Sequence, residues 1–385
     1  MPPVVKAALR ALEYLPWAKS VEGLARLNLT GSGIADTVSN GSDDDEAKAI
    51  VESWSDALEV AQLCSRDVRR RAREEFIEVV SERYGVEAEK VTPTLGASLA
   101  ITHVLMALLR SGDHVIVERP TYEPLHRVPE LLGANTSRLE RDAADGWAVR
   151  PDRLARLLTP RTKAVILSNL HNPSGVALDR NTLLEVTELA ARVGAVVLVD
   201  EVYLDYDFPA DADAAIQPAC RVAPNCISWS SSTKCFGFSA LRAGWIVTGN
   251  PEANRVIRAA TNYLHVDEPV STLMLGARVL RDSERLTAWA KRVGSAGQAI
   301  VQKWIDNEPR VSWVAPHAGL SGCVRLPDLM NDGPFVEHLR ERYQTQVVPG
   351  SFFEAPGFIR LSFGVKPADL EEGLANISSA LDDLT

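Results

Sequence analysis

The chain has 385 residues, of which 46% are hydrophobic and 24% are charged, and its 41 basic and 51 acidic side chains give a net charge of -10. This composition is typical of a globular protein with a large apolar core, and the length predicts two or three domains. The acidic balance argues against a nucleic-acid-binding protein, which would carry a basic face.

Cysteine usage and hydropathy indicate the cellular setting. The five cysteines are scattered, odd in number and without a CxxC pair: Cys64, Cys220, Cys226, Cys235 and Cys323. This pattern favours reduced thiols over a disulfide framework or a zinc site. The first twenty residues lack the apolar core of a signal peptide, and no run of about eighteen apolar residues predicts a membrane helix. We therefore expect a cytoplasmic protein with no membrane contact and no metal site.

Predicted elements follow one another in a regular order along the chain. A polar segment at residues 39–46 precedes a helix, and short apolar segments then alternate with amphipathic ones to about residue 275. The predicted strands are 114–118, 163–168, 195–199, 226–229 and 243–248, and the clearest helices are 97–110 and 181–193. Strands separated by helices predict an α/β fold with a mainly parallel sheet flanked by helices. Such sheets bind ligands at the carboxyl ends of their strands.

The last hundred residues have a different pattern. Helical spacing alternates here with short apolar segments, which predicts a smaller α+β unit. Its predicted helices are 285–306 and 333–343, and its predicted strands are 311–314, 322–326 and 358–363.

Four polar loops stand where strands end or helices begin. Thr94–Ser98 precedes a helix, whose free amides attract phosphate, although a glycine there is more often an ordinary cap. Asn169–Gly175 and Asp200–Tyr203 each follow an apolar strand, and an aspartate at such a point is as often a helix cap. Ser230–Lys234 is a hydroxyl-rich turn with one lysine, and Arg242 follows it. Together these loops suit a phosphorylated aldehyde with a pyridine ring, bound by a lysine.

The order of these segments carries a resemblance to a known family. TLGAS, ERPTY, HNPSG, VDEVY, SSSTKCFGFSALRAGW and FIRLSFG run in that order from about residue 91 to 364. In these segments the chain resembles the fold-type I pyridoxal-phosphate-dependent enzymes of the class I/II aminotransferase superfamily. The resemblance implies a large cofactor-binding domain at 45–280 and a small discontinuous domain made of 1–44 and 281–385.

The resemblance assigns a role to each residue that would contact the cofactor ring. Lys234 would form the Schiff base with pyridoxal 5′-phosphate, and its freed amine would then carry a proton. Asp200 would pair with the ring nitrogen and keep the ring an electron sink. Asn172 and Tyr203 would hydrogen-bond the phenolic oxygen, and Tyr122 would stack on the ring.

Phosphate and substrate contacts are implied in the same way. Arg360 would grip the substrate α-carboxylate as a planar bidentate partner. Asn172 and, in the segment Thr30–Ile34, Gly33 would also contact substrate, although Gly33 is at least as well interpreted as a turn glycine. The phosphate would be held by Gly96, Ala97, Ser98, Ser231 and Arg242.

The sequence departs from the family pattern in two respects. Residues 57–70 contain no tyrosine, whereas many members use a tyrosine there to contact the partner subunit's cofactor phosphate; Arg66 is a candidate replacement. No arginine can be assigned as the second arginine of dicarboxylate-specific transaminases, so strict aspartate specificity is disfavoured. His171, Cys235 and His265 are candidates for positions near the pocket, with the side chain of Cys235 expected to point away.

Two classes of function remain. The first is an enzyme of amino-acid metabolism, a homodimeric aminotransferase moving an amino group from an L-amino acid to a 2-oxo acid. A cyclase, an elimination or replacement enzyme, or an oxidase would use the same Lys234, Asp200 and Arg360. The second is a non-catalytic regulator that keeps this fold as a sensor; the acidic charge, and the mere forty or so residues before the large domain, disfavour it.

Overall fold

A computed structural model gives the fold of residues 12–34, 65–207 and 216–384. The polar segment 39–46 and residues 57–64 of the tyrosine-free stretch, which include Cys64, lie outside the described residues.

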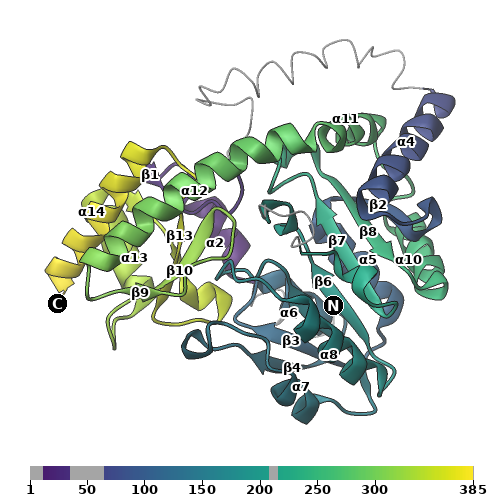
Figure 1. The fold of residues 1–385 in the computed structure, drawn as a ribbon, viewed down its shortest axis with the longest axis horizontal. Helices are drawn as coiled ribbons and strands as arrows, with labels where there is room; N and C mark the ends of the chain where they lie inside the picture. Colours follow the sequence, from purple (N-terminus) through teal and green to yellow (C-terminus); the bar gives the residue numbers. More distant parts are fainter. Residues whose placement is uncertain (1–11, 35–64, 208–215, 385) are drawn as a thin grey trace.

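A seven-stranded sheet forms the larger part of the molecule (Figure 1), with strand order β2-β8-β7-β6-β5-β3-β4. β8 is antiparallel to both of its neighbours, and the remaining pairs are parallel, which confirms the predicted mainly parallel sheet. The strands are β2 (Val91–Leu95), β3 (His114–Arg119), β4 (Asn135–Glu140), β5 (Thr162–Ser168), β6 (Val196–Asp200), β7 (Cys226–Ser231) and β8 (Ala243–Thr248).

Helices cover both faces of this sheet. Successive strand residues point to opposite faces, so Val115 and Val117 pack with α5 and α10, whereas Ile116 packs with α8. Both faces are therefore buried, which explains why the central strands are almost continuously apolar. One face carries α5 (Gly96–Leu108), α6 (Glu123–Leu131) and α10 (Pro251–Leu264); the other carries α4 (Arg66–Tyr84), α7 (Pro151–Leu157), α8 (Arg180–Ala191), α9 (Ala219–Val222) and α11 (Val270–Arg281).

A second, four-stranded antiparallel sheet has the order β12-β13-β10-β9. Its strands are β9 (Ser312–Trp313), β10 (Ser321–Arg325), β12 (Val348–Pro349) and β13 (Phe358–Ser362), and β9 is shorter than the predicted strand 311–314. The long helix α12 (Ser283–Asn307) runs from the large sheet to this one, where α13 (Asp332–Tyr343) and α14 (Pro367–Leu384) also pack (Figure 1).

Segments from both ends of the chain meet beside the small sheet. β1 (Leu27–Asn28) pairs in parallel with β11 (Thr345–Gln346), and the Leu29 oxygen accepts the Ser362 amide at 2.9 Å. The N-terminal helix α2 (Tyr14–Ser20) precedes this pairing. The remaining elements are 3₁₀ turns: η3 (Ala88–Lys90), η4 (Ala143–Asp145), η5 (Leu204–Tyr206), η7 (Ser239–Leu241) and η8 (Gly350–Phe353).

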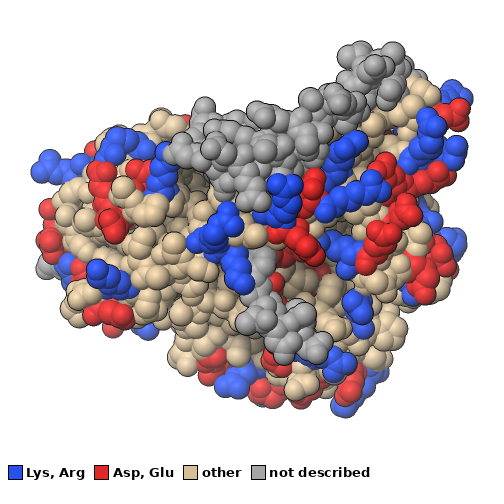
Figure 2. Space-filling model, turned by 45° about the horizontal axis from the view of Figure 1, so that its top comes forward, with Lys and Arg blue, Asp and Glu red and all other residues tan. Residues whose placement is uncertain are grey.

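Charge on the outside is mixed in sign. Figure 2 shows basic and acidic side chains interspersed over the face that it views, with uncharged surface between them. Such a surface keeps a protein soluble without creating a field of one sign.

Candidate active site

A cavity of about 380 Å³ lies at the carboxyl ends of β5, β6 and β7, beside the start of α5. Its volume is in the usual range for a small-molecule site. Its lining contains ten of the predicted site residues: Ala97, Ser98, Tyr122, Asn172, Asp200, Tyr203, Ser231, Lys234, Arg242 and Arg360. Gly33 and Gly96, the other two, lie just behind the lining, as described below.

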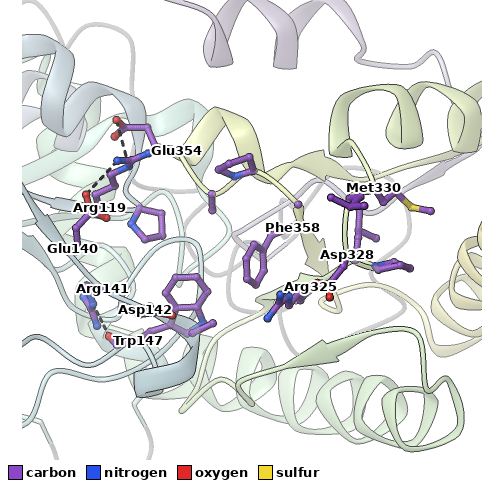
Figure 3. A pocket seen from close by; sticks show the side chains of 18 residues that line it. Arg119, Glu140, Arg141, Asp142, Trp147, Arg325, Asp328, Met330, Glu354 and Phe358 are labelled. Atoms are coloured by element: carbon purple, nitrogen blue, oxygen red, sulfur yellow. Dashed lines mark hydrogen bonds and ion pairs between the residues drawn. The ribbon is translucent and has the colours of Figure 1, made fainter.

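A larger cavity, of about 460 Å³, lies between the ends of β3 and β4 and the loop after β10 (Figure 3). None of the predicted site residues lines it. Its charged side chains pair with one another, as Arg119 does with Glu140 at 3.2 Å and Arg325 with Asp328 at 2.8 Å. The smaller cavity, which holds groups suited to chemistry, is therefore the candidate active site.

One end of the active-site cavity is built for an anion. Gly96 opens α5 with a φ of 77°, and a side chain there would place its Cβ 2.5 Å from Arg242 Nη2. Gly244 lies so close that its own Cβ would be 2.7 Å from the Gly96 backbone. These two glycines thus let Arg242 reach the start of α5, whose first amides have no side-chain cap. Free amides and a guanidinium group suit a phosphate.

Asp200 ends strand β6, where it pairs in register with Ser168 of β5 and Trp229 of β7. Its Oδ1 accepts the Val202 amide at 3.2 Å, and no α-helix begins in the described residues 201–207, so the helix-cap interpretation is wrong. Burial raises the pKa of Asp200 to about 6 because a buried carboxylate loses hydration. A cationic partner at this point would restore its ionised form.

Lys234 lies in the turn after β7. Its backbone oxygen accepts the Ile34 amide at 3.0 Å and the Tyr206 hydroxyl at 2.6 Å, so its backbone is fixed. Burial, and then the positive charges of Arg360 and Arg242, lower the pKa of Lys234 to about 8. The amine is therefore neutral, and so nucleophilic, over more of the physiological range than an exposed lysine.

Two details near Lys234 differ from expectation. Ser230 and Ser231 belong to strand β7 rather than to a turn, because both continue its pairing with β8. Gly33 does not line the cavity; it packs against Lys234, and a Cβ there would lie 3.1 Å from the Lys234 oxygen. Its small size thus makes room for the lysine backbone.

The middle of the cavity carries neutral hydrogen-bonding groups. Tyr203 donates its hydroxyl proton to Ser32 Oγ at 2.9 Å, and Asn172 Oδ1 accepts from Arg360 Nη1 at 3.2 Å. Burial raises the pKa of Tyr122 and of Tyr203 well above the ordinary value. Both phenols therefore keep their protons at neutral pH.

Arg360 is only 2% exposed. Its Nη2 donates to the Thr30 oxygen at 2.8 Å and to the Tyr14 hydroxyl at 3.0 Å, and its guanidinium lies 4.8 Å from the centre of the Phe353 ring. Within the described part of the chain no carboxylate pairs with it. A buried cation with neutral partners is available to bind an anion.

Several lining residues are absent from the sequence-based prediction. Sequence reasoning missed Tyr14, Leu15 and Lys19 on α2, together with Ser168, and in the segment Thr30–Ile34 it singled out Gly33 rather than Ser32. Tyr14 meets Arg360 across 346 positions of sequence. No local motif signals such a contact, since only the tertiary fold brings α2 to the cavity.

The other candidates lie outside the cavity. His171 is buried, with its Nε2 2.9 Å from the Pro120 oxygen and its Nδ1 2.6 Å from Ser174 Oγ. Cys235 is fully buried, donates to the Val202 oxygen at 3.2 Å and has its pKa raised well above the ordinary value by burial, so it is an inert thiol. His265 stacks on His103 with ring centres 5.1 Å apart. Arg66 is the exposed first residue of α4.

Two further findings concern the described residues alone. In these ranges no helix combines the length and the apolar character needed to cross a membrane. Nor do any three His, Cys, Asp or Glu side chains in them gather so that they could hold a metal ion.

The whole lining fits pyridoxal phosphate: an anion cradle, a lysine of lowered pKa, a buried carboxylate and a free arginine share one cavity. The family model for class I and II aminotransferases matches residues 38–377. The chain belongs to this family. It is an aminotransferase-family enzyme whose cofactor is pyridoxal 5′-phosphate.

Three relatives show the extent of the similarity. The arginine–pyruvate transaminase of Pseudomonas aeruginosa is 27% identical over 355 residues, which cover 89% of this chain and 88% of that protein. A PLP-dependent aminotransferase from Streptococcus suis has a TM-score of 0.82 at 26% identity, covering 97% of this chain and 99% of that one. A PLP-dependent cyclase has a TM-score of 0.81 at 25% identity, covering 100% and 98%.

Proposed function

We propose that the enzyme moves an amino group from an L-amino acid to a 2-oxo acid, with pyridoxal phosphate attached to Lys234. One observation carries this proposal: Lys234 with its lowered pKa, buried Asp200 and carboxylate-free Arg360 line the same cavity. When bound, the cofactor ring supplies the electron sink that makes the substrate Cα proton acidic. The residues around it supply binding, orientation and proton transfer.

On the cofactor side, each residue has a role that matches its surroundings. Asp200 would keep the ring nitrogen protonated, and that positive charge would in turn hold the carboxylate ionised. Tyr122 would stack on the ring, and Asn172 and Tyr203 would hydrogen-bond its phenolic oxygen. Donors to the phosphate would be the amides of Gly96, Ala97 and Ser98, the hydroxyls of Ser98 and Ser231, and the guanidinium of Arg242.

On the substrate side, Arg360 would bind the α-carboxylate, with Asn172 holding its guanidinium in place. A fixed carboxylate orients the Cα–H bond, which is where most of the rate gain from positioning arises. Lys234 Nζ, once released from the cofactor, would take the proton from Cα and return it. Gly33 would act through its packing on the Lys234 backbone.

The test of this proposal replaces Lys234 with alanine. The purified parent should be yellow, and its visible absorbance should change when an L-amino acid is added. Lys234→Ala should lose amino transfer by at least about a thousandfold, since the variant lacks the amine that serves as nucleophile and base. Lys303→Ala, on the exposed face of α12, is the matched control. Equal activity in Lys234→Ala and the parent would show that another residue holds the cofactor.

A second candidate reaction is cyclisation, elimination or replacement, or oxidation at the same site. The similarity to a PLP-dependent cyclase over the full chain supports this second candidate. A panel of L-amino acids with several 2-oxo acids separates the two. New amino acids detected by mass spectrometry indicate transamination, whereas a modified donor without any amino-group transfer indicates the second candidate.

We also propose that two copies of the chain associate. Tyr263 at the end of α10 is 92% exposed and Val266 is 70% exposed, and large apolar side chains on a surface favour a protein partner. Light scattering should therefore give twice the chain mass. A fully active monomer would contradict this.

Two further assignments belong to the same proposal. A cytoplasmic location is supported by the buried, unpaired state of Cys220, Cys226, Cys235 and Cys323, the described cysteines. The division into a cofactor domain at 45–280 and a smaller one made of 1–44 and 281–385 is supported by the pairing of β1 with β11. Limited proteolysis with fragments ending near 45 and 280 would test the division.

A further inference from the structure

Helix α2 is anchored beside the substrate side of the cavity at two points. The carboxylate of Glu123, which is buried, accepts the backbone amides of Glu13 and Tyr14 at 2.7 and 3.1 Å. The Tyr14 hydroxyl accepts from Arg360, and its ring meets Tyr122 edge-on with centres 5.9 Å apart. Because its backbone and a side chain are both held, the helix presents a fixed face to the cavity.

That face carries Tyr14, Leu15 and Lys19, all of which line the cavity. At 3.6 residues per turn the three side chains fall within an arc of about 140°. Trp17 lies next to Tyr14 on the side of the helix away from Leu15 and Lys19, and it packs on Phe352 with ring centres 4.8 Å apart. The chain therefore places Lys19, an exposed residue, at the cavity from an element outside the proposed cofactor contacts.

The charges of the lining leave this lysine without a partner. Its described cations are Lys19, Lys234, Arg242 and Arg360, and its described carboxylate is Asp200. In the proposed function Lys234 is joined to the cofactor, Arg242 faces the phosphate and Arg360 faces the α-carboxylate. Within the described ranges Lys19 has no ion-pair partner. A second anionic group on the substrate would supply one.

We propose that Lys19 is a substrate-specificity residue that binds the acidic side chain of an amino acid and the second carboxylate of a 2-oxo diacid. This inference rests on the proposed function. Lys19 lies five residues beyond Tyr14, or about 7.5 Å of helix rise from the contact with Arg360. A flexible lysine stem and an acidic side chain span that separation together, and Leu15 covers the methylenes between. Lys19 on α2 would thus bind the second carboxylate, the role for which the sequence offers no assignable second arginine.

The experiment compares L-glutamate with L-glutamine, which have the same length and differ in side-chain charge. Single-turnover reactions of the holoenzyme are followed by the change in cofactor absorbance. The parent should react with glutamate at least about tenfold faster than with glutamine, as a charge-assisted hydrogen bond predicts. Lys19→Met should lose this preference by slowing glutamate alone, and Lys19→Glu should reverse it. The control, Lys303→Met, should keep the parent ratio.

A binding measurement gives a readout that is independent of turnover. Calorimetry on the holoenzyme should show glutarate binding about tenfold more weakly to Lys19→Met than to the parent, with butyrate binding unchanged. Equal rates with glutamate and glutamine in the parent, or an unchanged ratio in Lys19→Met, would overturn the assignment while leaving transamination intact. If no amino acid changes the absorbance, the proposed function itself fails, and the assignment of Lys19 fails with it.

Discussion

The two sides of the active-site cavity are built in different ways. The proposed cofactor side, defined by Ser98, Asp200, Ser231, Lys234 and Arg242, sits on or directly beside strands of the large sheet and the start of α5. The proposed substrate side, defined by Tyr14, Lys19 and Arg360, comes from segments near the two ends of the chain, and side-chain contacts join Tyr14 to Arg360 and hold the start of α2. The first is fixed by backbone pairing within the large sheet. On the second, backbone pairing fixes Arg360 in β13, whereas the residues of α2 depend on how distant segments pack.

This difference suggests how one fold can serve many substrates. The groups proposed to hold the cofactor lie on or beside the large sheet, where small movements are costly. Lys19, the proposed selectivity residue, lies on the short helix α2, which can change without disturbing the sheet. Both sides hold a charge in an unfavourable setting, since Asp200 and Arg360 are buried and neither forms a salt bridge within the described ranges. A cationic group bound beside Asp200 and an anionic group bound beside Arg360 would reduce this cost.

The strongest test of this separation is Arg360→Ala. Removing the guanidinium leaves the substrate α-carboxylate without its cation, a loss of about 2–5 kcal/mol. The second-order rate constant with amino acids should fall by about thirtyfold to several thousandfold in stopped-flow measurements, and cofactor affinity should be unchanged. Arg325→Ala, in the larger cavity, is the control. An equal loss of cofactor binding in Arg360→Ala would mean that the two sides are not separate.

The apoenzyme of Asp200→Asn tests the electrostatic cost on the cofactor side. The folded pKa of Asp200, about 6, is above its ordinary value of 3.8, so the folded state binds the extra proton between these values. Stability is therefore lost as pH rises from about 4 to 6, and the cost of about 3 kcal/mol is complete above pH 6. In urea unfolding, the free energy of unfolding of Asp200→Asn should be higher than that of the parent by up to about 3 kcal/mol at pH 7. The two free energies should be equal near pH 4.

Its control is Asp328→Asn, at an exposed position. If the difference in unfolding free energy between Asp200→Asn and the parent did not change with pH, burial would not be raising the pKa of Asp200. Cofactor affinity should meanwhile fall in Asp200→Asn, because the ring nitrogen loses its partner.

Gly244→Ala perturbs the cofactor side through the backbone. The new Cβ would lie 2.7 Å from the Gly96 backbone, so β8 and the start of α5 must move apart. Overpacking of this kind costs about 1–3 kcal/mol, and a matching loss of cofactor affinity is expected in an absorbance titration. Gly249→Ala, with nothing within 4 Å of its added Cβ, should behave as the parent. An altered glutamate-to-glutamine ratio at saturating cofactor would contradict the separation of the two sides.

The position of a strand in the large sheet decides whether the sequence predicts it. The central strands β3, β5, β6, β7 and β8 are apolar and were predicted. β2 and β4 were not, and both are edge strands. β2 contains Pro93, and β4 reads NTSRLE. Edge strands tolerate proline and polar residues because one side has no pairing partner and fewer contacts to satisfy.

The candidate site follows a parallel rule. Asp200 and Lys234 can be found from sequence because each lies in a short motif beside an apolar strand, and a parallel sheet brings strand ends together. Tyr14, Lys19 and Ser32 carry no such signal, since their positions depend on contacts such as that of Tyr203 with Ser32, 171 positions away. Local pattern thus predicts the lining residues beside the large sheet and Arg360, whereas only tertiary packing brings the residues of α2 to the cavity.

The smallest expected effect is that of Tyr14→Phe, which distinguishes binding of the substrate α-carboxylate from recognition of the substrate side chain. Tyr14→Phe keeps the ring that meets Tyr122 but removes the hydroxyl that accepts from Arg360, which retains the Thr30 oxygen at 2.8 Å and Asn172. Losing one such hydrogen bond costs about 1 kcal/mol. Half-saturating concentrations should rise about fivefold for glutamate and glutamine alike, with little change in maximal rate. Because Tyr14 contacts the arginine that binds the carboxylate common to both, a change in their ratio would instead place Tyr14 with Lys19 as a determinant of side-chain selectivity.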